Sequence, residues 1–226
     1  MINDPYNCLY IHMPKTAGNS VNRLFGMSWQ NHKDLGRYSL ELGVERCLAY
    51  HRFAIVRNPW DRLLSEYNFQ RRKSRPDASR LHIFDKHGRE RRFSEWVRVV
   101  FDDPFRYPAS TWGGEVSPHI HRWSPQVDWL SLGGKLAIDS ILRLECLPKD
   151  ITALQRRLGM PTRRMPHRNW KFHWHYSRYY DEPTRELVRR FYASDLRAFA
   201  YDFEAPSSDA SWLLQWAWSR FAPRAA

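Results

Sequence analysis

The stretch YIHMPKTAGNS, residues 10–20, sets a lysine and a glycine between an apolar run and a helix-like pattern. A loop that leaves a strand and enters a helix presents unpaired backbone N–H groups and the positive end of the helix dipole, so it attracts anions. Gly18 allows the backbone to approach a ligand closely, and Lys15 adds a full positive charge. Further hydroxyl and amide donors follow at Thr16, Asn19 and Ser20. The pattern indicates a phosphate site.

A second stretch, VRNPWDRLLSEY at residues 56–67, repeats this chemistry. Arg57 ends an apolar run, and Ser65 falls inside the helix that follows. A long guanidinium and a hydroxyl could converge on one phosphate beside that helix. The alternative is that Arg57 pairs with Asp61 or Glu66 and that Ser65 is only solvated, and the sequence leaves both readings open.

Three strand-then-helix units position these residues. The apolar runs predict strands at 8–13, 53–56 and 135–145. Helices are expected after each, the second capped by Asn58 with Pro59 in its first turn, and the third opening at Pro148 and stopping at Gly159. Because parallel strands need crossover connections, the pattern predicts an α/β fold with a central parallel sheet flanked by helices. Ligands bind such sheets at the carboxyl ends of the strands.

The remaining segments fit one domain over residues 1–204. Residues 71–123 are expected to form a charged insertion or lid, in which Ser94 caps a short helix. Asp181 and Pro183 start another helix. The Trp-rich residues 205–226 are expected to form a helical tail that docks on the fold or makes peripheral membrane contact.

Composition narrows the partners and the compartment. The formal net charge of +12 favours anionic partners such as nucleotides and acidic glycans. The three cysteines are widely spaced and form no C-x-x-C pair, which suits a reducing cytosol. No stretch approaches the ~18 uninterrupted apolar residues of a membrane span. A cytoplasmic protein is expected.

The two phosphate-binding stretches resemble those of sulfotransferases that use 3′-phosphoadenosine 5′-phosphosulfate (PAPS), especially the carbohydrate branch of the heparan 2-O and chondroitin/dermatan enzymes. The likeness extends through PQVDWL at 125–130, ILRLECLPKDITALQRRLGM at 141–160 and YYDEPTRELVRRFYASDLRAFAYDF at 179–203. It implies the sulfotransferase variant of the P-loop NTPase-like fold. It also implies PAPS as the donor and a hydroxyl-bearing carbohydrate, possibly anionic, as the acceptor. The eukaryotic enzymes carry an N-terminal membrane anchor, whereas the first strand predicted here begins at residue 8. A bacterial cytoplasmic enzyme is therefore the simpler expectation.

The resemblance also implies roles for individual residues. Arg57 and Ser65 would hold the 3′-phosphate, and Lys15 would stabilise the leaving phosphate. His32 would be the catalytic base, because the heparan branch places a histidine about two dozen residues ahead of the arginine; the substitutes are His51, His119 and His121. The 5′-phosphosulfate would be cradled by Lys15, Thr16, Ala17, Gly18, Asn19 and Ser20. Contacts with adenosine or its 3′-phosphate are suggested for Arg168, Asn169 and Lys171.

Other classes of function remain as alternatives. Two His-x-His pairs, at 119–121 and 173–175, have no nearby acidic or cysteine partners, so no metal site is expected. The run LAID at 136–139 superficially resembles the strand and aspartate that position magnesium in a P-loop kinase or NTPase. The basic, aromatic RNWKFHWHYSRYY is compatible with a nucleic-acid-binding protein.

Overall fold

The computed structural model describes residues 1–27, 32–73, 82–102, 117–118, 120, 123–165 and 174–204. Its strands are β1 (Ile2–Asn3), β2 (Cys8–Ile11), β3 (His51–Val56), β4 (Ser131–Leu132), β5 (Lys135–Leu136) and β6 (Ser140–Arg143). Its α-helices are α1 (Gly18–Leu24), α2 (Leu35–Leu42), α3 (Val44–Ala49), α4 (Pro59–Lys73), α5 (Phe93–Asp102), α6 (Gln126–Trp129), α7 (Leu147–Arg157), α8 (Glu182–Phe191) and α9 (Ala193–Phe199). Short 3-10 helices stand at Asp4–Tyr6, Leu144–Cys146 and Tyr176–Tyr179.

The central sheet has the strand order β1-β2-β3-β6. The pairs β2–β3 and β3–β6 are parallel, as the strand-then-helix units predict, while β1 runs antiparallel to β2. The sheet is therefore mixed rather than wholly parallel. The carboxyl ends of β2 and β3 meet at one edge, and the loops that carry Lys15 and Arg57 leave from that edge.

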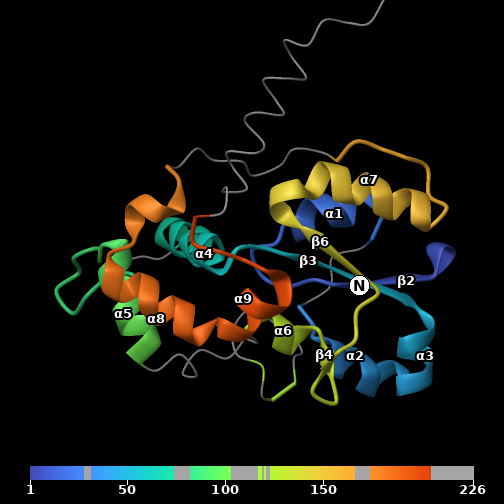
Figure 1. The fold of residues 1–226 in the computed structure, drawn as a ribbon, viewed down its shortest axis with the longest axis horizontal. Helices are drawn as coiled ribbons and strands as arrows, with labels where there is room; N and C mark the ends of the chain where they lie inside the picture. The colour runs from blue at the N-terminus through green and yellow to red at the C-terminus, as the bar shows by residue number, and fades with distance from the viewer. Residues whose placement is uncertain are drawn as a thin grey trace, which may run out of the picture.

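Helices cover both faces of this sheet (Figure 1). Tyr10 and Phe53 point to the face covered by α1 and α7, where they meet Val21 and Ile151. Leu9, Ile11, Ala54 and Val56 point to the opposite face, where the core includes Leu35, Cys47, Trp129 and Phe199. Successive residues of a strand alternate between faces, so strands covered on both sides are apolar throughout. This explains the uninterrupted apolar runs in the sequence.

A third core lies beyond the strand ends, where α4, α5 and α8 pack together (Figure 1). Helix α4 contributes one apolar face to this core, because Trp60, Leu63, Leu64 and Tyr67 are all buried in it. Ile83, within the charged region, is also fully buried there. The described part of that region is therefore anchored to the fold at Ile83 and along α5.

Local capping signals placed two helices correctly. The Asn58 side chain accepts a hydrogen bond from the Trp60 N–H at 3.1 Å at the start of α4. Asp181 accepts from the Thr184 N–H at 3.0 Å and caps α8. Helix α7 ends at Arg157, and Gly159 follows with a φ of 65°. The sequence prediction that Gly159 stops this helix is confirmed.

Other local predictions were wrong. Residues 135–145 do not form one strand: Lys135–Leu136 pair with Ser131–Leu132 in a separate hairpin, and β6 begins only at Ser140. Gly133 and Gly134 both adopt positive φ and turn that hairpin. Ser94 does not cap α5, which already begins at Phe93. The helices α2 and α3 were not predicted.

Candidate functional site

The loop between β2 and α1 is tightly folded. Lys15 and Ala17 adopt left-handed φ values of 68° and 61°, which residues with a Cβ rarely take. The Thr16 hydroxyl donates to the Met13 carbonyl at 2.9 Å, and Thr16 is fully buried. The Tyr10 hydroxyl is 3.4 Å from the Thr16 carbonyl oxygen. These contacts hold a backbone shape that costs energy, as is common where a loop binds a ligand.

Two backbone donors at the end of this loop have no acceptor among the described residues. They are the N–H groups of Gly18 and Asn19, at the start of α1. The next two N–H groups, of Ser20 and Val21, both bond the Ala17 carbonyl oxygen. The side chain of Asn19 is exposed, and that of Ser20 is buried. The loop therefore offers N–H donors beside the Lys15 charge.

His12 forms the floor of the loop. A Cβ built on Gly18 would stand 1.7 Å from His12 Nε2, so the imidazole occupies the space of a side chain at position 18. The His12 ring is stacked on Tyr10 with centroids 5.5 Å apart. Burial, followed by the proximity of His32, lowers the pKa of His12 well below its ordinary value. His12 is therefore neutral at physiological pH.

His32 lies against His12, with ring centroids 4.4 Å apart. Its Nδ1 is 2.9 Å from the His12 carbonyl oxygen. Because a carbonyl oxygen only accepts hydrogen bonds, this contact puts the proton of neutral His32 on Nδ1 and leaves the lone pair on Nε2. Two residues later, Asp34 caps α2. The Asp34 carboxylate also accepts hydrogen bonds from the backbone N–H of Ser117 at 2.7 Å and from the Ser117 hydroxyl at 2.8 Å. His32 is thus anchored through its ring and through Asp34.

Arg57 connects the two phosphate-binding stretches. Its Nε and Nη2 contact the two carboxylate oxygens of Asp61 at 3.0 and 2.9 Å, so the ion pair that the sequence left open is present. Its Nη1 donates to the carbonyl oxygen of Lys15 at 3.4 Å. Ser65 is half-buried and has no hydrogen-bond partner in the described part of the chain. The structure therefore brings Arg57 and the Lys15 loop together and leaves the Ser65 hydroxyl unpaired within that part.

A comparison with protein-family models shows the family of the chain. The model of the Sulfotransferase family matches residues 1–202. The chain belongs to the sulfotransferase family. Neither the curated proteins nor the solved structures compared with it include a match. The family membership supports sulfotransfer activity, as the resemblance in the sequence implied.

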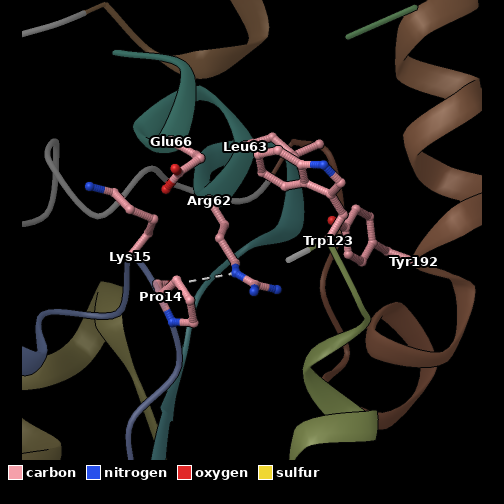
Figure 2. Close-up of a pocket in the computed structure, with 7 residues that line it drawn as sticks. All are labelled: Pro14, Lys15, Arg62, Leu63, Glu66, Trp123 and Tyr192. Atoms are coloured by element: carbon pink, nitrogen blue, oxygen red, sulfur yellow. Dashed lines mark hydrogen bonds between the residues drawn. The ribbon is translucent and has the colours of Figure 1, made fainter. Parts of the chain in front are cut away.

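The sulfotransferase has a small pocket on the α4 side of Lys15 (Figure 2). Glu66 and Arg62 reach it from α4, while Trp123 and Tyr192 close one wall. Arg62 is 5% exposed, and it donates from Nε to the Pro14 carbonyl and from Nη1 to the Ser124 carbonyl, both at 3.3 Å. The Lys15 ammonium lies 4.2 Å from the centre of the Phe69 ring. Arg57, just before α4, and Arg62, within α4, therefore donate to consecutive carbonyl groups of the loop, those of Lys15 and Pro14.

Of the other predicted site residues, His51 lies within the described part of the chain, and it is not brought to this place. His51 lies at the amino end of β3, where its Nε2 is 2.9 Å from the Ser140 hydroxyl. The remaining positions lie outside the described residues: His119, His121, Arg168, Asn169, Lys171 and His173. In the described part of the chain there is no cluster of three or more potential metal ligands. Within the same part, no helix has the length and apolar character needed to cross a membrane.

Sequence reasoning missed His12 and Arg62. It also missed Gln126, whose side-chain amide accepts from the Arg57 N–H at 2.9 Å and donates to the Arg57 carbonyl at 2.8 Å. The position of His12, two residues before Pro14 at the end of an apolar strand, was a usable signal, because strand ends of parallel sheets carry functional side chains. Arg62 had no signal beyond its charge. Gln126 was visible only within PQVDWL, and nothing in that segment tells which backbone its amide contacts.

Proposed function

We propose that this sulfotransferase moves the sulfonyl group of PAPS to a hydroxyl of a carbohydrate acceptor. The observation that carries the proposal is the contact between Arg57 Nη1 and the Lys15 carbonyl oxygen, at 3.4 Å. Because of this contact, the Arg57 guanidinium, at the junction of β3 and α4, lies beside the loop between β2 and α1, which is suited to bind an anion. PAPS carries a 5′-phosphosulfate and a 3′-phosphate, so it needs two such neighbouring anion sites. Members of the sulfotransferase family generally use PAPS as the donor of the sulfonyl group.

In this proposal, the segment from Lys15 to Ser20 holds the 5′-phosphosulfate. The N–H groups of Gly18 and Asn19 are suited to its oxygens, and Lys15 supplies the charge. Thr16 and Ala17 contribute through their backbone, since the Thr16 hydroxyl is already bonded to Met13. Arg57 and Ser65 hold the 3′-phosphate, with the Arg57 rotamer fixed by Asp61.

The transfer is an in-line displacement at sulfur. The acceptor oxygen forms a bond to sulfur while the bond from sulfur to the bridging phosphate oxygen breaks, and adenosine 3′,5′-bisphosphate leaves with that electron pair. Lys15 stabilises the charge that grows on the bridging oxygen. The proton of the acceptor hydroxyl passes to His32 Nε2, whose lone pair is directed away from the His12 carbonyl.

The rival kinase reading is disfavoured by the position of Asp139. Its carboxylate bonds the backbone N–H and the guanidinium of Arg52 at 2.8 to 2.9 Å, just ahead of β6. A residue that positions magnesium stands at the carboxyl end of its strand, close to the phosphates. Asp139 lies at the opposite end.

Charge and thiols suggest the acceptor and the compartment. A net charge of +12 suits an anionic glycan. Cys8, Cys47 and Cys146 are all free, and the first two are buried, which suits a reducing cytoplasm.

Two measurements test the proposal. Calorimetry is expected to detect binding of adenosine 3′,5′-bisphosphate and much weaker binding of ATP with magnesium. Transfer of labelled sulfate from PAPS to members of a glycan array is expected to persist in EDTA. Failure of the bisphosphate to bind, or transfer that requires magnesium and a triphosphate, would contradict the assignment.

A further inference from the structure

The side chain of Gln126 forms hydrogen bonds with both backbone groups of Arg57, its N–H and its carbonyl. Its Oε1 accepts from the Arg57 N–H at 2.9 Å, and its Nε2 donates to the Arg57 carbonyl at 2.8 Å. Gln126 is fully buried. Arg57 directly follows the last residue of β3, so the amide of Gln126 extends the pairing of that strand by one residue.

Asp195 holds Gln126 in this orientation. Its Oδ2 accepts from the backbone N–H of Gln126 at 2.8 Å and from Nε2 at 3.1 Å, and its Oδ1 accepts from the Val127 N–H at 2.9 Å. The Arg57 N–H can only donate, so the amide oxygen of Gln126 faces it, and the amide nitrogen of Gln126 then faces Asp195 Oδ2. Asp195 is itself fully buried, in α9.

We infer that Gln126 is a positioning residue for Arg57, and that Asp195 sets the direction of the Gln126 amide. The inference rests on the proposed function, in which Arg57 binds the 3′-phosphate of the donor. Gln126 fixes where the Arg57 backbone stands, whereas Asp61 fixes the direction of its side chain. Both are needed for Arg57 Nη1 to reach toward the Lys15 loop.

This role predicts a selective effect on ligand binding. Gln126 touches neither the Lys15 loop nor Ser65 through any hydrogen bond in the described part of the chain. Loss of these bonds should displace Arg57 and its contact with the Lys15 carbonyl. The loop stays held by Arg62 at the Pro14 carbonyl and by the Thr16 hydroxyl at the Met13 carbonyl, so the N–H donors of the 5′-phosphosulfate cradle should change little. A misplacement of about 1 Å at a functional group can lower a reaction rate by about a hundredfold, and we expect a loss of affinity of up to the same order. A purely structural role would instead weaken all nucleotides alike.

The test compares the affinity for adenosine 3′,5′-bisphosphate with that for adenosine 5′-monophosphate by calorimetry. Gln126→Glu keeps the volume and the acceptor for the Arg57 N–H but removes the donor Nε2–H. Gln126→Met keeps the length and removes both bonds. The matched control is Ser131→Ala, because the Ser131 hydroxyl donates to the Val127 carbonyl of the same short helix at 2.8 Å but does not contact Arg57.

The wild-type enzyme should prefer the bisphosphate, and Gln126→Glu should lower that preference by about tenfold or more, while Ser131→Ala leaves it unchanged. Thermal unfolding identifies any variant that does not fold. If Gln126→Glu fails because its second oxygen faces Asp195 and the Arg57 carbonyl, Gln126→Met, which adds no charge, decides the case by the same criteria. An unchanged preference in Gln126→Glu, or an equal loss for both nucleotides, would overturn the inference. A wild-type enzyme that shows no preference for the bisphosphate would instead overturn the proposed function.

Discussion

The imidazole of His12 fills the space in front of Gly18, where a Cβ would fall 1.7 Å from Nε2. The ring cannot easily move away, because Tyr10 stacks on it and His32 lies 4.4 Å from it between ring centroids. The glycine of the loop is therefore required by a side chain beneath the loop, in addition to any ligand above it. This contact links the donor loop to the histidine proposed as the base.

Gly18→Ala is expected to disrupt the loop. Heavy atoms do not approach to 1.7 Å, so either the His12 ring or the start of α1 must shift, at a cost of about 1–3 kcal/mol for overpacking. Because the Gly18 and Asn19 N–H groups move with the helix start, binding of adenosine 3′,5′-bisphosphate should be lost. Urea unfolding and calorimetry measure the two effects.

The control for this change is Gly26→Ala, just beyond α1. Gly26 has a φ of 64°, and no atom lies within 4 Å of its Cβ position. Only the left-handed backbone is penalised, by about 1–2 kcal/mol, and nucleotide affinity should persist. Adding His12→Ala to Gly18→Ala removes the overlapping ring and should recover part of the stability. Equal nucleotide affinities for Gly18→Ala and the wild type would contradict the tight contact.

Stability should fall in acid partly because of His12. Its folded-state pKa is lowered, chiefly by burial, so above about pH 6.5 the folded and unfolded chains both hold it neutral and it adds no pH dependence. Below about pH 6.5 the unfolded chain binds a proton that the folded chain resists, and the free energy of unfolding falls by up to about 1.4 kcal/mol per pH unit.

Urea unfolding at several pH values, for the wild type and His12→Gln, measures this contribution as a difference in slope. His51 acts in the same direction, because burial and Arg157 lower its pKa too. His51→Gln should flatten the curve less, since that ring is only half-buried. Identical slopes for His12→Gln and the wild type would show that His12 is not the group responsible.

Ser65→Ala should separate ligand binding from stability. The hydroxyl is half-buried without a partner in the described part of the chain, so its removal should change the free energy of unfolding by no more than about 0.5 kcal/mol. Binding of adenosine 3′,5′-bisphosphate should weaken by about tenfold, the value of one hydrogen bond to a charged group. Adenosine 5′-monophosphate should bind as before, and equal loss for both nucleotides would exclude a contact with the 3′-phosphate.

His32→Gln should lower the rate of transfer and not donor affinity. General-base catalysis is worth about 10²–10⁴ in rate, and glutamine can still donate to the His12 carbonyl without accepting a proton. Single-turnover transfer from PAPS measures the rate, and calorimetry with adenosine 3′,5′-bisphosphate measures the affinity. His51→Gln, at the far end of β3, is the matched histidine control and should retain its rate. An unimpaired rate in His32→Gln would show that another group takes the proton.

Much of the fold could be predicted because its signals are local. The apolar runs gave β2 and β3, and the caps at Asn58 and Asp181 gave the starts of α4 and α8, since a cap depends only on residues a few positions away. The prediction for 135–145 failed because its alternation fits two short strands as well as one. The pairing of β4 with β5 depends on the turn at Gly133 and Gly134.

For the candidate site, the sequence by itself determined which charges stand near the strand ends, because Lys15 lies in the loop after the buried strand β2 and Arg57 directly follows the buried end of β3. It did not determine what those residues touch. The contacts of Arg57 with Lys15 and Gln126, and of His12 with His32, join segments far apart in the chain, and only the packing of the helices around the sheet brings them together. Apart from the i,i+4 pair of Arg57 with Asp61, which the sequence offered as one alternative, the hydrogen bonds that orient these residues come from partners distant in the chain. Tertiary structure therefore decided the geometry of the site, because no local pattern encodes those partners.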